Sequence, residues 1–306
     1  MRDFQNRVWD RLHRSFSTKN IPNAYIFSGP AGSGKENFAI QFTKLLNCEN
    51  PSYFGCGECS SCIRIKNLQH ENLKIIFPLP APLSKNKNSN KLIDNKNIEI
   101  VNQLISKKAE DGFFKIKVSG ANRILINSIR DLRSSIYLKS NKNRQRVILI
   151  FDSHFLSFGQ GEAANALLKL LEEPPQNTLF ILVTDHINLL LNTINSRCQI
   201  ISFPKLNDRF IEKWLSLNTE LETNVNFFLG LSNGNIHIAK KLILHEKNEI
   251  IRLINNIIKT LISKNSSLWR SFNQTYSKIL KEDKDLFYLH LTILKIWFQS
   301  TYRLTK

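Results

Sequence analysis

The chain has 306 residues, of which 42% are hydrophobic, so it can form two or three domains with a buried core. It has no run of 18 or more apolar residues, which argues against a membrane span. Charges separate Phe4, Val8, Leu12 and Phe16 on one face of a predicted first helix, so a signal peptide is not indicated. The sequence therefore predicts a cytoplasmic protein.

The formal net charge of +18 has two explanations, and the composition does not decide between them. Lys and Arg side chains release counterions from phosphates, so a nucleic-acid partner is one of them. The other is a general abundance of Lys, Asn and Ile, which leaves most Lys on a solvated surface. The charge fits proximity to DNA but locates no binding groove.

In chain order, the first part of the sequence alternates between apolar runs and helical spacing. A run at 24–27 precedes a Gly-rich turn and a helix at 37–46, and residues 78–95, with three prolines, predict a loop within a 78–120 insertion of unassigned role. Further strands are predicted at 73–77, 147–151, 179–183 and 199–203, and further helices at 122–138 and 161–172. Strands that alternate with helices predict an α/β fold with a parallel sheet.

Strand patterns end at Pro204, and every later segment has helical spacing. Short helices are predicted at 207–217, 221–230 and 235–246, and helical spacing continues from 248 to 303. We expect an α/β domain at 1–205 followed by helical segments at 206–246 and 247–306. We find no internal repeat.

Residues Gly29 to Lys35 follow a predicted strand and precede a predicted helix, which is the context of a phosphate-binding P-loop. Gly29, Gly32 and Gly34 let backbone N–H groups turn inward as a nest for phosphate oxygens, and Lys35 is placed to reach the outer phosphates. The alternative is a plain glycine turn.

The residue after Lys35 departs from a working P-loop, which has a Ser or Thr hydroxyl there to bind Mg²⁺. Glu36 supplies a carboxylate instead, and that group repels a triphosphate. Asp152 ends a predicted strand where P-loop ATPases carry a Mg²⁺-holding Asp, although it also fits a helix cap or turn. Ser153 follows it and cannot act as a general base without a partner.

Four cysteines stand close together with the spacing C-x7-C-x2-C-x2-C: Cys48, Cys56, Cys59 and Cys62. Short C-x2-C steps let thiolates converge on one Zn²⁺, and four thiolates close the coordination shell, so we predict a structural zinc site. A cytoplasmic setting disfavours disulfides. The alternative is a reduced Cys-rich loop without metal. Cys198 stands apart and is predicted to be a small buried apolar residue.

In combination, these motifs resemble those of bacterial DNA polymerase III clamp-loader subunits, which are AAA+ P-loop proteins. The segment 164–175 looks like their NALLKxLEEPP motif, and 193–198 looks like their SRC motif. A cysteine cluster directly after the P-loop helix is characteristic of the gamma/tau and delta-prime subunits. Residues 69–72 lie where this family often has His-Pro-Asp. The resemblance covers about residues 1–240.

The resemblance implies a RecA-like core at 1–205 with a zinc module at 48–62, a helical lid at 206–246 and a collar-like oligomerisation segment at 247–306. In this family the SRC arginine enters a neighbour's ATP site, so the resemblance implies that Arg197 is an arginine finger in trans. The alternative is that Arg197 forms a helix-end or surface ion pair. Thr184 matches the region of the first sensor, or is a plain strand-end hydroxyl. His237 aligns where active members have a second-sensor arginine.

Glu36, Ser153 and His237 all weaken nucleotide chemistry in this chain, whereas Arg197, which would serve a neighbour, is kept. This asymmetry favours a delta-prime-like subunit with a vestigial nucleotide site, so that ATP and Mg²⁺ bind weakly or not at all. The expected partners are the gamma/tau and delta subunits, the sliding clamp and, through the complex, primed DNA, with no membrane.

Two rival functions remain open. The first is an active gamma/tau-type ATPase, which tight Mg²⁺-dependent ATP binding and turnover would reveal. The second is a basic zinc protein that contacts DNA on its own, which salt-dependent DNA affinity would favour. DNA contact alone requires neither the LEEPP segment nor the SRC segment.

Overall fold

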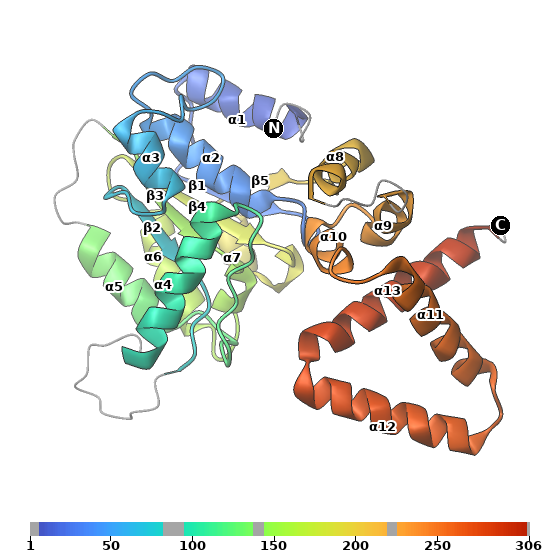
Figure 1. Ribbon diagram of the computed structural model, residues 1–306. Coiled ribbons are helices and arrows are strands. Elements are labelled where there is room, and N and C mark those ends of the chain that lie inside the picture. Colours follow the sequence, from blue (N-terminus) through green and yellow to red (C-terminus); the bar gives the residue numbers. More distant parts are fainter. Residues whose placement is uncertain (1–5, 82–94, 137–143, 219–224, 305–306) are drawn as a thin grey trace. The chain divides into compact units, whose positions relative to one another are not determined.

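The computed structural model describes residues 6–81, 95–136, 144–218 and 225–304. The chain divides into two compact units, Met1–Lys205 and Leu206–Lys306. Figure 1 labels the elements of both units. Most of the predicted loop at 78–95 lies outside the described residues, and so does the first part of the predicted helix at 221–230. Among these residues, no helix is long and apolar enough to cross a membrane.

A parallel β-sheet forms the centre of the first unit, as the alternation of strands and helices predicts. In the part of the chain that the structure describes, five strands are hydrogen-bonded in the order β2-β3-β4-β1-β5. Their bounds are Ala24–Ser28 for β1, Leu73–Ile76 for β2, Arg146–Ile150 for β3, Thr178–Thr184 for β4 and Gln199–Ser202 for β5. Every residue of β1 and β4 is buried, which explains their continuous apolar runs. In the edge strand β5, only Ile201 is buried.

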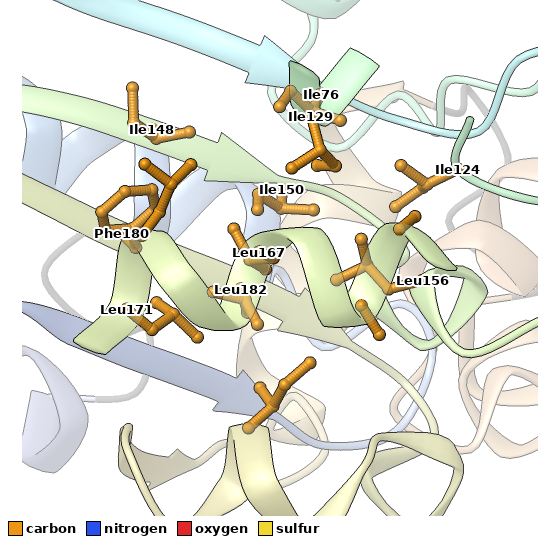
Figure 2. Close-up of a cluster of buried hydrophobic side chains, with 14 of the residues drawn as sticks. Ile76, Ile124, Ile129, Ile148, Ile150, Leu156, Leu167, Leu171, Phe180 and Leu182 are labelled. Carbon is orange, nitrogen blue, oxygen red and sulfur yellow. The ribbon is translucent and has the colours of Figure 1, made fainter. Parts of the chain in front are cut away.

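One face of the sheet is covered by α5 (Ile126–Ile136), α6 (Glu162–Glu172) and the short α7 (Asn192–Asn195). Figure 2 shows Leu167 and Leu171 of α6 against Ile150, Phe180 and Leu182 of the strands. Side chains of a strand alternate between the two faces of a sheet, so every second residue of β3 and β4 enters this cluster. The alternate residues of β3 and β4 face the opposite layer.

That opposite layer contains α2 (Lys35–Asn47), with α1 (Asn6–Ser17) and α3 (Ser60–Lys66) beside it. Aromatic rings connect α2 to the sheet: Tyr25 meets Phe42 edge to face at 6.1 Å, and Phe38 meets Phe203 at 5.3 Å. The first unit is thus a three-layer α/β core of the RecA-like class. Two 3₁₀ turns, Ser153–Leu156 and Ile187–Leu189, follow β3 and β4.

Within the 78–120 insertion, the structure has a helix that the sequence analysis did not predict. This helix, α4 (Asn95–Glu110), has buried Val101 and Lys108 on its inner side. The turn that follows it buries Ile116 and Val118. Residues 95–120 of the insertion are therefore packed onto the core rather than extended away from it.

The second unit is helical throughout its described residues, as predicted. Its helices are α8 (Asp208–Asn218), α9 (Val225–Ser232), α10 (Ile236–Leu242), α11 (Lys247–Ile262), α12 (Ser266–Glu282) and α13 (Lys284–Leu304). Asn235 caps α10 and Asn265 caps α12, each by accepting a hydrogen bond from a backbone N–H in the first turn. A capping box between Glu246 and Glu249 begins α11.

Candidate functional site

Polar side chains gather where β1, β3 and β4 end. The P-loop follows β1, Asp152 comes soon after β3, and Asp185 directly follows β4. These three strands are neighbours in the sheet, so their carboxyl ends lie along one edge. In open parallel sheets this edge is the usual place for a ligand site.

The P-loop backbone has the conformation that its glycines allow. Gly32 and Gly34 have φ of 71° and 81°, a left-handed region that glycine enters at little cost. A Cβ on Gly29 would lie 2.3 Å from the carbonyl oxygen of Phe203, so the loop also needs glycine for its close approach to the chain after β5. The glycine pattern is thus explained by backbone geometry.

Lys35 is turned toward its own loop and is 4% exposed. Its ammonium donates to the carbonyl oxygens of Gly29 at 2.8 Å and Pro30 at 2.7 Å, and it lies 2.7 Å from a carboxylate oxygen of Asp185. An ammonium has three protons, and these contacts occupy all of them. Burial lowers the pKa of Lys35, while Asp185 opposes that shift.

Glu36 is also satisfied within the chain. One of its carboxylate oxygens lies 2.5 Å from the ammonium of Lys108, and the other lies 2.8 Å from that of Lys115. Burial alone would raise the pKa of Glu36, but the two ammonium groups outweigh it and hold the pKa well below its usual range. Glu36 is therefore an ionised, buried carboxylate with two cationic partners.

Lys108 and Lys115 come from α4 and from the turn after it. Lys108, whose side chain is 1% exposed, also donates to the carbonyl oxygens of Gly112 at 3.0 Å and Phe114 at 2.7 Å. A Cβ on Gly112 would lie 2.5 Å from the side-chain oxygen of Asn37, so glycine lets this turn approach α2 closely. The insertion thereby delivers two cations to the P-loop.

Lys115 joins Glu36 to Asp152, because its ammonium lies 2.6 Å from a carboxylate oxygen of Asp152. Burial opposes the charge on Lys115, but Glu36 and Asp152 raise its pKa above the usual range. Three carboxylates and three ammonium groups thus form what we call the ion cluster: Lys35, Glu36, Lys108, Lys115, Asp152 and Asp185. These residues do not fit a Mg²⁺ ion, since position 36 has no hydroxyl and an ammonium lies between the carboxylates.

Asp152 has φ of 50° and begins a 3₁₀ turn, but its side chain makes no capping hydrogen bond there. The next residue, Ser153, is fully buried, and its hydroxyl donates to the carbonyl oxygen of Val183 at 3.2 Å. The hydroxyl of Thr184 accepts from the backbone N–H of His186 and lies 3.2 Å from Nδ1 of His154. Ser153 and Thr184 thus engage groups at the end of β4.

We expect His154 to make the stability of the first unit sensitive to acid. Burial, followed by the nearby His186, lowers the pKa of His154 to about 4, whereas unfolded histidine titrates at about 6.5. Between these values the unfolded chain binds more protons, so stability falls as the pH drops. We expect a loss of roughly 1–3 kcal/mol from this residue between neutral pH and pH about 4. Urea unfolding across this range, with NMR titration of the ring, measures it.

Asp185 and Lys115 are the charged groups near His154, and they act on its pKa in opposite directions. His154→Gln cannot take up the proton, so its stability should depend less steeply on pH in this window. An unchanged slope in that variant would assign the acid sensitivity to other groups.

The four clustered cysteines converge as their spacing predicts. Their sulfur atoms all lie within 4.8 Å of one another, and those of Cys56 and Cys62 are 3.9 Å apart. Tetrahedral zinc with Zn–S bonds of about 2.3 Å needs sulfur atoms about 3.8 Å apart, so the geometry fits. Backbone N–H groups of Cys56, Cys59 and Cys62 donate to the sulfur atoms of Cys48, Cys56 and Cys59, respectively.

The thiols of the cluster differ in acidity. Backbone N–H groups of Cys59 and Glu58 lower the pKa of Cys56 to about 6, whereas burial raises that of Cys62 to about 12. A bound divalent cation is what lets four neighbouring thiols all ionise. Cys198 is half-buried against the hydrophobic core, and burial raises its pKa to about 12.

Arg197 lies outside the ion cluster, in the turn between α7 and β5. Its guanidinium lies 2.8 Å from a carboxylate oxygen of Glu172 and donates to the carbonyl oxygen of Thr193 at 2.9 Å. Glu172 is the last residue of α6, so this ion pair connects the LEEPP segment to the SRC segment. Both side chains are more than a third exposed.

The structure therefore brings together Lys35 and Asp152 with the P-loop glycines, but it holds the cysteine cluster and Arg197 elsewhere. His237 lies in the second unit, on α10. Sequence reasoning missed Asp185, Lys108 and Lys115. The acidic residue in the P-loop was the available signal, because a buried carboxylate needs cationic partners. Nothing local distinguished Lys108 and Lys115 from the other lysines.

Comparison with known proteins shows the family of this chain. The model of a family described as "DNA polymerase III, delta subunit" matches residues 4–207, which is more than half of the chain. The chain belongs to the DNA polymerase III delta subunit family. The resemblance to bacterial clamp-loader subunits that the motifs suggested is thereby confirmed, and the match includes the P-loop, the cysteine cluster and Arg197.

Relatives of this DNA polymerase III family member include both subunit types. The tau subunit of Bacillus subtilis is 30% identical over 68% of this chain and 29% of its own length. The delta' subunit of the same organism is 26% identical over 85% of this chain and 64% of its own length. The delta' subunit of Pseudomonas aeruginosa is 25% identical over 88% of this chain and 70% of its own length. The chain thus spans less than two thirds of the two Bacillus relatives.

Proposed function

We propose that this chain acts as a delta-prime-type clamp-loader subunit that does not hydrolyse ATP itself. The ion cluster carries the proposal. Lys35, which would contact phosphates, is engaged with its own loop and Asp185, and Glu36 holds two lysines where a metal-binding hydroxyl is needed. Binding Mg-ATP would require all of these contacts to be exchanged.

In this proposal Arg197 serves a neighbouring ATPase subunit. An exposed ion pair such as that with Glu172 contributes only about 0–1 kcal/mol, so the guanidinium can leave it at small cost for a γ-phosphate. A planar guanidinium contacts phosphate oxygens in pairs and stabilises the charge of the transition state. The partners proposed are gamma/tau and delta subunits, the sliding clamp and primed DNA.

We also propose that the four clustered cysteines bind one Zn²⁺ as a structural ion. The sulfur spacing supports this assignment, as does the closed set of four thiolates, which leaves no position for a substrate. The ion would join the end of α2 to α3 and to the loop between them.

The arginine proposal is tested in a clamp loader reconstituted with this subunit. Arg197→Ala should slow hydrolysis at the adjoining site by about 10³–10⁵-fold, so that total ATPase falls to the level of the remaining sites. Arg197→Lys keeps the charge but loses the paired contacts and should recover little. Arg133→Ala removes an exposed arginine of α5 and is the matched control.

Normal ATPase in the Arg197→Ala assembly would contradict the finger assignment. Nucleotide titration of the isolated chain, with and without Mg²⁺, tests the other half of the proposal. Tight Mg²⁺-dependent binding with turnover would instead favour the gamma/tau-type ATPase.

A further inference from the structure

We infer that the ammonium group of Lys115 is a built-in substitute for the divalent cation of a working P-loop site. Its nitrogen is 2.8 Å from a carboxylate oxygen of Glu36 and 2.6 Å from one of Asp152. Residue 36 and the Asp after β3 are the two positions from which P-loop enzymes hold Mg²⁺.

The chemistry of the two carboxylates requires a cation between them. Glu36 and Asp152 are both mostly buried, with side chains 11% and 12% exposed, and carboxylates that face each other in such a place repel. A positive group that contacts both removes the repulsion. Lys115 provides that group from within the chain, so no metal ion is needed.

The insertion is built to keep this ammonium in place. Lys108 anchors the turn by its bonds to the carbonyl oxygens of Gly112 and Phe114, and it binds the second oxygen of Glu36. Ile116, next to Lys115, is buried in the core. The position of Lys115 is therefore fixed by packing on both sides of it, and the insertion has a role that the sequence did not suggest.

Glu36 then has a role of its own. A serine or threonine hydroxyl at this position would leave Lys115 with Asp152 alone, whereas the carboxylate gives the ammonium a second anionic contact. The carboxylate at position 36 and the ammonium of Lys115 thus act as a matched pair. This inference rests on the proposed function only in that the site does not process ATP.

The test is to remove the substitute and offer a real cation. Lys115→Ala leaves Glu36 and Asp152 as hard oxygen ligands, which Ca²⁺ and Mg²⁺ prefer. We expect the melting temperature of this variant of the full chain to fall, and to rise again with millimolar CaCl₂ or MgCl₂ but not with KCl of equal ionic strength. The original chain should show no such divalent response.

Lys107→Ala, which removes an exposed lysine from the same helix, is the matched control and should behave like the original chain. The inference is overturned if Lys115→Ala gains no divalent stabilisation, or if the original chain gains as much. If Lys115→Ala does not fold, Lys115→Met is compared with Lys115→Met combined with Asp152→Asn. The double variant should melt higher, and an equal or lower melting temperature would also refute the inference.

This test uses neither ATP nor the other subunits. A divalent response in Lys115→Ala together with normal ATPase in Arg197→Ala assemblies would therefore refute the proposed function alone. No divalent response in Lys115→Ala together with reduced ATPase in Arg197→Ala assemblies would refute the cation substitution alone.

Discussion

Lys108→Met is expected to destabilise the first unit by about 3–5 kcal/mol, because it breaks a buried ion pair by removing one partner. Lys108 has a side chain 1% exposed and holds Glu36 together with two backbone carbonyl groups. Methionine fills similar space but donates no hydrogen bond, so both carbonyl oxygens lose a donor. The ammonium of Lys108 also lies 5.4 Å from the centre of the Phe151 ring, and the substitution removes this contact as well.

Hydrogen exchange of β4 in the full chain measures this effect, since β4 is central in the sheet and exchanges by opening of the unit. Lys107→Met alters the neighbouring exposed residue with the same change of charge, and surface substitutions of this kind stay within about 0.5 kcal/mol. Equal exchange rates in the two variants would show that the buried pair contributes little.

We expect the purified chain to contain about one zinc ion, bound at the cysteine cluster, and we expect removal of this ion to unfold the zinc module at 48–62 locally. In zinc-finger peptides, binding of such an ion contributes about 10–16 kcal/mol of apparent folding free energy. Here the loop of the module rests on α1: the ring of Trp9 stacks on Phe54 at 4.9 Å and its indole N–H donates to the carbonyl oxygen of Tyr53. Loss of the ion should therefore disturb Trp9 as well as α3.

Elemental analysis of the purified chain gives the metal content. Hydrogen exchange of α3 and of α1, which contains Trp9, follows the removal of the ion by a chelator. Cys62→Ser should reproduce the loss of protection, because its sulfur is the fully buried one of the four. Cys198→Ser, outside the cluster, should keep the metal. A metal-free chain with α3 as well protected as before would rule out a structural zinc.

The parts of the fold that were predictable are those in which a local pattern carries the information. Strands β1, β3 and β4 are continuous apolar runs because both faces of a parallel sheet are covered. The P-loop and the cysteine cluster were recognised because glycine conformation and sulfur coordination impose short fixed spacings. The helical second unit was also predictable, because strand patterns end at Pro204 and helical spacing follows.

The ion cluster was not predictable by the same means. Glu36 meets Lys108 and Lys115 across 72 and 79 residues of sequence, and no periodicity relates such distant positions. Lysine is also so frequent in this chain that neither residue stands out. Helix α4 was missed because it follows a Lys- and Asn-rich stretch that suggests a loop, although packing against the core stabilises it.

The electrical balance of the ion cluster has a consequence for encounters with small anions. Three negative and three positive side chains cancel there, so the chain's +18 must be distributed over other surfaces. The ion cluster therefore adds no net charge of its own that would steer a diffusing triphosphate toward the P-loop. Any faster capture of polyanions at low ionic strength should therefore come from the excess lysine and arginine elsewhere on this protein and not from the ion cluster.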